Sequence, residues 1–212
     1  MAQAFASPAS RRPPRTRVTC WAIIPVKGPD QGKLRLSGVL DEAQRRRLVR
    51  AMLAHVVTAA ESATTIGRTC ILGPSRHGLD AAVAMLSDPG GGLNAALTSA
   101  LAEAERGGAS RAVFVAGDLP QASTLDIELL AAAPQGSIAI APDRHGTGTN
   151  ALSLPLPGAR DFMFAFGPDS FAAHHGEAER LGLKIEEIHS PGLMRDIDVP
   201  DDLPDAASLP GG

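Results

Sequence analysis

The ten residues Ala141–Asn150 (APDRHGTGTN) contain the densest set of chemically useful side chains in the sequence. One acidic side chain, two basic side chains, two glycines and two threonines follow an apolar run, Ser137–Ile140, that is typical of a buried strand. Threonine hydroxyls and free backbone N–H groups suit the oxygens of a phosphate, and glycines let the backbone approach a ligand closely. The segment therefore predicts a site for a small anionic ligand, although its composition assigns no separate roles to Asp143, Arg144 and His145.

An acid stands directly after another apolar run, in the sequence Gly117-Asp118-Leu119-Pro120. A carboxylate held between Gly and Pro is a suitable hard-oxygen ligand for Mg²⁺, which usually takes one or two carboxylates together with substrate phosphates. The alternative is that Asp118 only forms a turn. A second acid comes from Arg195-Asp196-Ile197-Asp198, where alternation places both aspartates on one side of an extended segment. Asp198 is the preferred second metal ligand, and Asp196 is the alternative.

Basic side chains follow the first apolar run of the chain, in Val26–Leu36 (VKGPDQGKLRL). A glycine-bearing loop with Lys27, Lys33 and Arg35 suits the phosphates of a nucleotide. The G-x-x-x-x-G-K-[ST] spacing of a P-loop is absent, and surface lysines are common. The loop alone therefore does not establish nucleotide binding.

Three glycines precede a predicted helix in Pro89–Leu97 (PGGGLNAAL). This spacing differs from the dinucleotide fingerprint G-x-G-x-x-G. The glycines either give a loop room to turn or allow a nucleoside to approach. We favour the second interpretation, in which Gly92, Leu93 and Asn94 contact the nucleotide and the Asn94 amide bonds a ribose or base.

Another candidate anion site is the start of a helix at Phe166-Gly167-Pro168-Asp169-Ser170. Free N–H groups at helix N-termini hold anions, although an ordinary N-cap is the commoner role for a serine such as Ser170. His174 lies one turn further along, where a substrate contact and a position on the helix surface are both open. The sequence shows no Ser-His-Asp arrangement with G-x-S-x-G and no zinc-ligand spacing.

Apolar runs and helical patterns alternate along the chain, which predicts a three-layer α/β domain with a mainly parallel sheet. Ligands bind such sheets at the carboxyl ends of the strands, so the separate motifs are expected to converge there. Asp41 with Gln44 forms a capping box that begins the first helix, and Ala82–Leu86 is open between helix and strand. The predicted strands are 18–26, 69–72, 112–116, 137–141, 150–154, 184–188 and 194–199, and the later helices are 93–106, 123–133 and 170–181.

The length of 212 residues suits one such domain, predicted over residues 18–206, with a disordered tail at 1–17 and a frayed end at 207–212. Aromatic residues make up 3% of the chain and the net charge is −3, which argues against general nucleic-acid binding. Cys20 and Cys70 are interpreted as reduced core thiols. Neither a membrane-spanning run nor a signal peptide is evident, so the expected location is the cytoplasm.

Taken in order, the motifs resemble those of the CofC/FbiD-type guanylyltransferases of deazaflavin coenzyme F-420 biosynthesis, within the MobA-like nucleotidyltransferases. The resemblance covers Ile24 to Leu203, and its most specific part is GTGTN together with the helix start FGPDS. The sequence departs from the family pattern in the short loop GPDQG between Lys27 and Lys33. The matching motifs are IPVK, KLRL, PGGGLNAAL, GDLP, APDRHGTGTNAL, FGPDSFAAH and DIDVPDDL.

The resemblance implies a Rossmann-like GT-A nucleotidyltransferase fold and the transfer of GMP from GTP to a small phosphorylated carboxylic acid, with Mg²⁺ and release of pyrophosphate. Phosphoenolpyruvate and 3-phospho-D-glycerate are the preferred acceptors, ahead of 2-phospho-L-lactate. The product would pass to a deazaflavin transferase, and a homodimer is one expected assembly. The implied roles are acceptor binding by Thr149, Gly167 and Ser170, catalysis by Lys27, Lys33 and Asp118, and metal binding by Asp118 and Asp198.

The chemistry agrees with the scarcity of catalytic bases, because an acceptor phosphate is already a competent nucleophile near neutral pH. Positioning and charge neutralisation would then supply the rate enhancement. Two alternatives remain. One is a molybdopterin-type guanylyltransferase, which the absence of a glycine-rich first loop disfavours. The other is a non-catalytic nucleotide-binding protein on the same fold, which would bind GTP without turnover.

Overall fold

The computed structural model describes residues 19–28 and 32–203. The predicted tail at 1–17, the predicted frayed end at 207–212 and residues 29–31 of the GPDQG loop lie outside the described residues. A seven-stranded mixed sheet has the order β3-β2-β1-β4-β6-β5-β7. Its strands are β1 (Cys20–Pro25), β2 (Ile66–Leu72), β3 (Ala84–Leu86), β4 (Arg111–Val115), β5 (Ser137–Pro142), β6 (Thr149–Pro155) and β7 (Lys184–Glu187).

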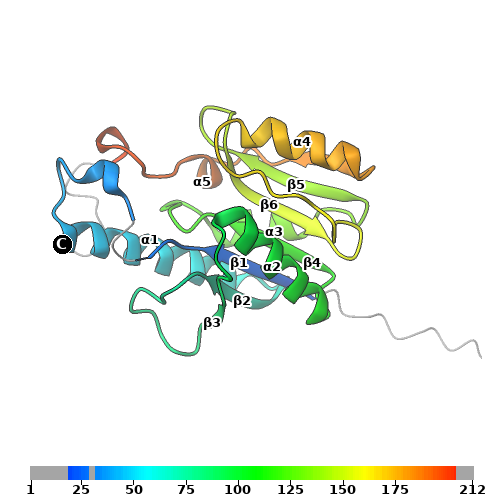
Figure 1. Cartoon of the computed structure of the whole chain (residues 1–212), viewed down its shortest axis with the longest axis horizontal. Helices are drawn as coiled ribbons and strands as arrows, with labels where there is room; N and C mark the ends of the chain where they lie inside the picture. The colour runs from blue at the N-terminus through cyan, green and yellow to red at the C-terminus, as the bar shows by residue number, and fades with distance from the viewer. Residues whose placement is uncertain (1–18, 29–31, 204–212) are drawn as a thin grey trace, which may run out of the picture.

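Helices cover both faces of this sheet, as the alternating pattern predicted (Figure 1). One apolar core lies between the sheet and α1, α3 and α5, and a second lies between the sheet and α2 and α4. Residues of β1 alternate between them: Ile24 packs into the first core and Ile23 into the second. The helices are α1 (Glu42–Ser62), α2 (Leu93–Arg106), α3 (Thr124–Ala131), α4 (Ser170–Arg180) and α5 (Pro191–Met194), with 3₁₀ turns at Leu34–Leu36 and Pro200–Asp202.

Local signals set the beginnings of the long helices. The Asp41 side chain accepts from the Gln44 backbone N–H at 2.7 Å, and Gln44 accepts in return from the Asp41 N–H at 2.8 Å, which is the predicted capping box. At α2, Gly92 is the N-cap with φ of 88°, a backbone conformation that side chains disfavour. The glycine run therefore provides the positive-φ turn that leads into α2.

The direction of β6 decides which residues reach the same edge of the sheet. β4 pairs parallel to β1, so the segments after both strands leave at one edge. β6 is antiparallel to β4, with Val115 opposite Ala151, so the start of β6 lies beside the end of β4. Lys27, Asp118 and Thr149 consequently come to one edge although they are far apart in sequence.

Two predictions about secondary structure are resolved here. Ala82–Leu86, which was open between helix and strand, contains the short parallel strand β3. The predicted final strand at Met194–Val199 is wrong, since Met194 ends α5 and the following residues cross the sheet edge without pairing to a strand. The apolar Ile197 that suggested a strand packs instead against Leu36, Leu48 and Met52.

No helix within residues 19–28 and 32–203 has the length and apolar character that a membrane span requires. The thiols of Cys20 and Cys70 are both free and buried, as predicted for core cysteines.

Candidate active site

A cavity of about 520 Å³ opens at the edge where β1 and β4 end and β6 begins. Its walls come from the loop after β1, the N-terminus of α2, the segment after β4, the start of β6 and the segment before the Pro200–Asp202 turn. The structure therefore brings together most of the residues singled out from the sequence. Those that line the cavity are Lys27, Lys33, Gly92, Leu93, Asp118, Thr149 and Asp198.

Three carboxylates gather at one end of this cavity. Asp118, Asp196 and Asp198 each place an oxygen within 4.8 Å of the others. Lys33 lies between two of them, since its ammonium donates to Asp118 Oδ2 and, at 2.7 Å, to Asp198 Oδ1. Asp196 and Asp198 thus lie on the same side of their segment, as alternation predicted. Both are close to Asp118, so the structure offers three candidate ligand carboxylates and does not select one of the two.

The pKa values of this cluster show the competing effects of burial and charge. Burial lowers the pKa of Lys33, but the carboxylates of Asp118 and Asp198 outweigh it, so the net pKa is raised and the ammonium stays charged. The pKa of Asp196 is raised, first by burial and then by the neighbouring charges of Asp118 and Asp198. Two carboxylates, Asp118 and Asp198, thus face the one ammonium of Lys33, while the exposed Arg35 lies 3.8 Å from Asp198.

Such a set of donors fits a divalent cation. Three hard carboxylate oxygens in mutual reach match the ligand chemistry of Mg²⁺, which is completed by water and phosphate oxygens. The side chains of Asp118 and Asp198 are 30% and 47% exposed, so a cation and its remaining ligands have access to them.

An ion pair that the sequence did not reveal supports the segment that carries Asp198. The Asp202 carboxylate accepts from the backbone N–H groups of Asp198 at 2.8 Å and Val199 at 2.9 Å. Arg144, from the loop between β5 and β6, donates to the same carboxylate, whose side chain is only 2% exposed. Arg144 thus acts through Asp202 to fix the backbone that carries Asp198. No sequence signal links residues so far apart.

The opposite wall of the cavity is built from neutral groups. Thr149 is 8% exposed and its hydroxyl oxygen lies 3.0 Å from Nδ1 of His174. His174 is fully buried, so the alternative that placed it on the helix surface is wrong. Burial lowers its pKa to about 4, with the charge of His175 acting in the same direction and Glu177 opposing it. The ring is therefore neutral near pH 7.

Neither Gly167, which is exposed, nor Ser170, which is buried, lines this cavity. Ser170 is 2% exposed, and Asp169, not Ser170, is the N-cap of α4. Gly167 has φ of 143°, which side chains rarely adopt, and it leads the chain from Phe166, a cavity-lining residue, into α4. Their predicted contacts with an acceptor are therefore not formed in this conformation and remain predictions.

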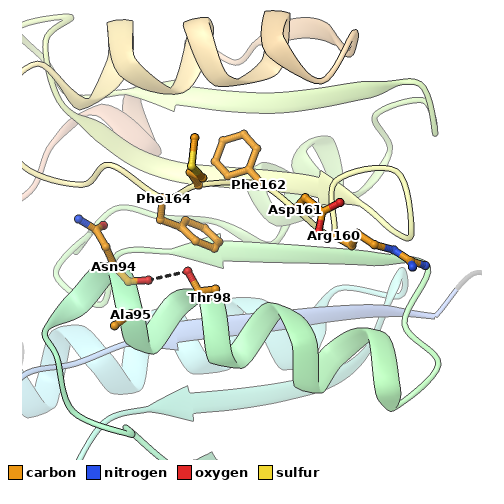
Figure 2. A pocket seen from close by; sticks show the side chains of 8 residues that line it. Asn94, Ala95, Thr98, Arg160, Asp161, Phe162 and Phe164 are labelled. Atoms are coloured by element: carbon orange, nitrogen blue, oxygen red, sulfur yellow. Dashed lines mark hydrogen bonds between the residues drawn. The ribbon is translucent and has the colours of Figure 1, made fainter.

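Asn94 does not line the main cavity. Its amide donates to the Phe166 carbonyl at 3.2 Å and accepts from the Phe166 N–H at 2.8 Å. Figure 2 shows Asn94 on α2 at one end of a second cavity of about 410 Å³, opposite Phe164. The amide therefore joins α2 to the segment before α4, and its contact with ribose or base stays a prediction.

Residues 20–207 match the family model described as guanylyl transferase CofC like. The chain belongs to this family. Its members here include a phosphoenolpyruvate guanylyltransferase of Sphaerobacter thermophilus, 39% identical over 90% of this chain and 93% of that protein. Another, from Nocardia farcinica, is 40% identical over 90% of this chain and 86% of its own length. The family assignment makes the chain a guanylyltransferase and agrees with the motifs.

Solved structures agree on the fold of this CofC-like chain. A nucleotide-diphospho-sugar transferase from Desulfovibrio desulfuricans G20 superposes with a TM-score of 0.68, at 17% identity, over 85% of this chain and 82% of its own. A nucleotidyl transferase from Methanothermobacter superposes with a TM-score of 0.60, at 16% identity, over 87% of this chain and 94% of its own. At these identities the likeness concerns the fold, and it confirms the predicted Rossmann-like nucleotidyltransferase architecture.

Proposed function

We propose that this guanylyltransferase moves GMP from GTP to a small three-carbon phosphorylated acid, with phosphoenolpyruvate as the first candidate, and releases pyrophosphate. The observation that carries the proposal is the cavity of about 520 Å³, which has a charged end suited to phosphates and a neutral, hydroxyl-bearing wall at Thr149. The relatives named phosphoenolpyruvate guanylyltransferase support this acceptor. 3-Phospho-D-glycerate is the next candidate, and 2-phospho-L-lactate follows it.

The nucleotide is expected along the wall formed by Lys27, Gly92 and Leu93, with its phosphates toward Lys33. α2 begins at the cavity lining with Gly92 and Leu93, and the partial positive charge of a helix N-terminus favours a phosphate. Lys27 is an exposed side chain at the mouth and is free to follow the phosphates. These residues bind and orient GTP so that its α-phosphorus faces the acceptor.

Asp118, Asp196 and Asp198 would hold Mg²⁺. When bound, the cation would neutralise the charge that gathers on the triphosphate. The protein would use Lys33 beside Asp118 to add positive charge at the same end of the cavity. The backbone support from Arg144 and Asp202 would keep Asp198 in place throughout.

The acceptor phosphate needs no protein base, because it is ionised near pH 7 and attacks as an anion. Orientation of the substrates and neutralisation of their charge would then supply the rate enhancement. Thr149 would hold the acceptor on the side opposite the carboxylates, with the segment Phe166–Ser170 as its backing. The reaction would belong to coenzyme F-420 biosynthesis in the cytoplasm, with the product used by a deazaflavin transferase.

The test is pyrophosphate release measured with GTP, ATP or CTP, each paired with the three acids, in the presence of Mg²⁺. We expect the rate of pyrophosphate release with GTP and one of the acids to be well above the rate with any other pairing. Release with CTP or ATP at the same rate would contradict the choice of nucleotide. GTP binding without release from any pairing would favour a non-catalytic nucleotide-binding protein.

A further inference from the structure

His174 joins three segments of the wall that would hold the acceptor. It projects from α4, one turn after Ser170, and is fully buried. One ring nitrogen lies 3.0 Å from the Thr149 hydroxyl at the start of β6, and the other accepts from the Ala165 N–H at 3.1 Å. The ring also packs edge-on against Phe166, with centroids 4.8 Å apart. Its position is thus fixed from several sides.

The partners of His174 determine where its proton lies. A backbone N–H can only donate, so the hydrogen bond from Ala165 requires Nε2 to be the unprotonated nitrogen. Burial keeps the ring neutral, with a pKa of about 4, and a neutral imidazole carries one proton. That proton must be on Nδ1, which therefore donates to Thr149 Oγ1.

This arrangement fixes the role of the threonine hydroxyl. Oγ1 accepts from His174, and within residues 19–28 and 32–203 it has no other hydrogen-bond partner. Its own proton is consequently free to be donated elsewhere, and Thr149 lines the main cavity. A donor at this position suits an anionic oxygen of a carboxylate or phosphate, which can only accept.

We propose that His174 is a positioning residue that holds Thr149 as a hydrogen-bond donor toward the anionic acceptor. The inference rests on the proposed function for the identity of the acceptor, but the direction of the hydrogen bonds stands on the geometry. His174 does not touch the reacting atoms. It acts by occupying one of the two lone pairs of Oγ1, which excludes the orientation with the hydroxyl proton toward His174 and leaves that proton for a ligand in the cavity.

Two substitutions separate the two hydrogen bonds of the ring. In His174→Asn, the side-chain amide reaches the place of Nδ1 and its NH₂ group can still donate to Thr149. In His174→Gln, the longer amide reaches the place of Nε2, so its oxygen can accept from Ala165 while the donation to Thr149 is lost. We expect His174→Gln to raise the acceptor KM roughly tenfold, the scale of one hydrogen bond to a charged group, with the GTP KM unchanged.

His174→Asn is then the conservative rescue, and it should recover most of the acceptor affinity that His174→Gln loses. His175→Asn is the matched control on the next residue, whose ring pairs with Glu187 away from Thr149. Equal acceptor KM values for wild type, His174→Gln and His174→Asn would overturn the proposal. Equal losses in both His174 variants, with lowered thermal stability, would also overturn it, because they indicate a structural role alone.

A double-mutant cycle with Thr149→Val tests whether His174 acts through the hydroxyl. If it does, His174→Gln adds no further loss once the hydroxyl is absent, so the double variant has the acceptor KM of Thr149→Val. If the two losses multiply, His174 acts independently of Thr149 and the proposal fails.

The proton position can be measured without turnover, which separates this inference from the proposed function. In protein with ¹⁵N-labelled histidine, the two ring nitrogens have distinct shifts according to which one is protonated. The expected spectrum has Nδ1 of His174 protonated and Nε2 unprotonated at pH 7, and His174→Gln identifies the signals. Protonation at Nε2, or at both nitrogens, would overturn the inference. Protonation at Nδ1 in a protein without guanylyl transfer would reject only the proposed function.

Discussion

The two walls of the cavity differ in charge and in exposure. Around Asp118, formal charges face each other in a partly exposed cluster, where Lys33 is shared between two carboxylates. Around Thr149, the groups are neutral and buried, and the hydroxyl is oriented by a histidine whose pKa is lowered to about 4. The first wall provides charge and the second provides direction.

The contrast follows from what each wall has to do. A cation and a triphosphate bring several charges that exchange with solvent, so their partners must be charged and accessible. Discrimination among small acids that carry similar charge depends instead on a fixed geometry, which buried neutral hydrogen bonds supply. We therefore expect changes at the charged wall to affect turnover and changes at the neutral wall to affect acceptor affinity.

Asp118→Asn tests the charged wall most severely. Loss of this carboxylate removes a metal ligand and a partner of Lys33, so turnover should fall on the order of 10²- to 10³-fold, as when a preorganised charge is removed. Pyrophosphate release measures the loss, and the far-ultraviolet circular dichroism should be unchanged. Asp201→Asn, at an exposed acid near the same cavity end, is the control. Near-normal turnover of Asp118→Asn would reject the metal assignment.

Thr149→Val tests the neutral wall. Valine keeps the branched shape and removes only the hydroxyl, so the acceptor KM should rise roughly ten- to hundredfold, the range for a hydrogen bond to a charged group. The GTP KM should stay the same. Thr149→Ser restores the hydroxyl and should recover acceptor affinity. Equal changes in the KM values of GTP and acceptor would contradict the division between the two walls.

Acid should weaken the neutral wall through His174. Its pKa is lowered to about 4 in the folded protein, so the unfolded chain binds a proton at higher pH and stability falls as pH drops from about 6.5 toward 4. The expected loss between pH 7.5 and pH 5 is about 2 kcal/mol. Denaturant unfolding of wild type and His174→Gln measures it, and a stability difference between them that does not change with pH would contradict the shift.

Asp202→Asn tests the support behind the charged wall. The carboxylate holds the backbone of Asp198 and pairs with Arg144, so its loss should weaken cation binding roughly tenfold, as substitutions behind metal ligands commonly do. Binding of Mn²⁺, followed by electron paramagnetic resonance, reports this without turnover. Unchanged Mn²⁺ affinity would show that the pair only stabilises the fold. Asp201→Asn serves as the control again.

Much of the fold could be predicted because its signals are local. The bounds of α2, Leu93–Arg106, were predicted as observed, since glycines flank both ends. The capping box at Asp41 likewise depends on residues three apart. The segment after Met194 was predicted wrongly because alternating apolar residues look the same whether they pair with a strand or pack on helices, as Ile197 does.

The candidate site could be predicted only as a set of residues. Strand ends meet at one edge by topology, which brought Lys27, Asp118 and Thr149 to the same cavity. The contacts that orient those residues join elements distant in sequence, as in Arg144 with Asp202 and Thr149 with His174. Such contacts depend on tertiary packing, and a single sequence has no periodicity that specifies them.

The most direct test identifies the product formed from GTP and phosphoenolpyruvate. Incubation of the protein with both substrates and Mg²⁺, followed by ³¹P NMR and mass spectrometry, should show a new diphosphate bond between GMP and the acid, with equal amounts of pyrophosphate. Asp118→Asn should give neither product. If GTP is only hydrolysed, or if it remains intact with each of the three acids, transfer of GMP to such an acceptor is contradicted.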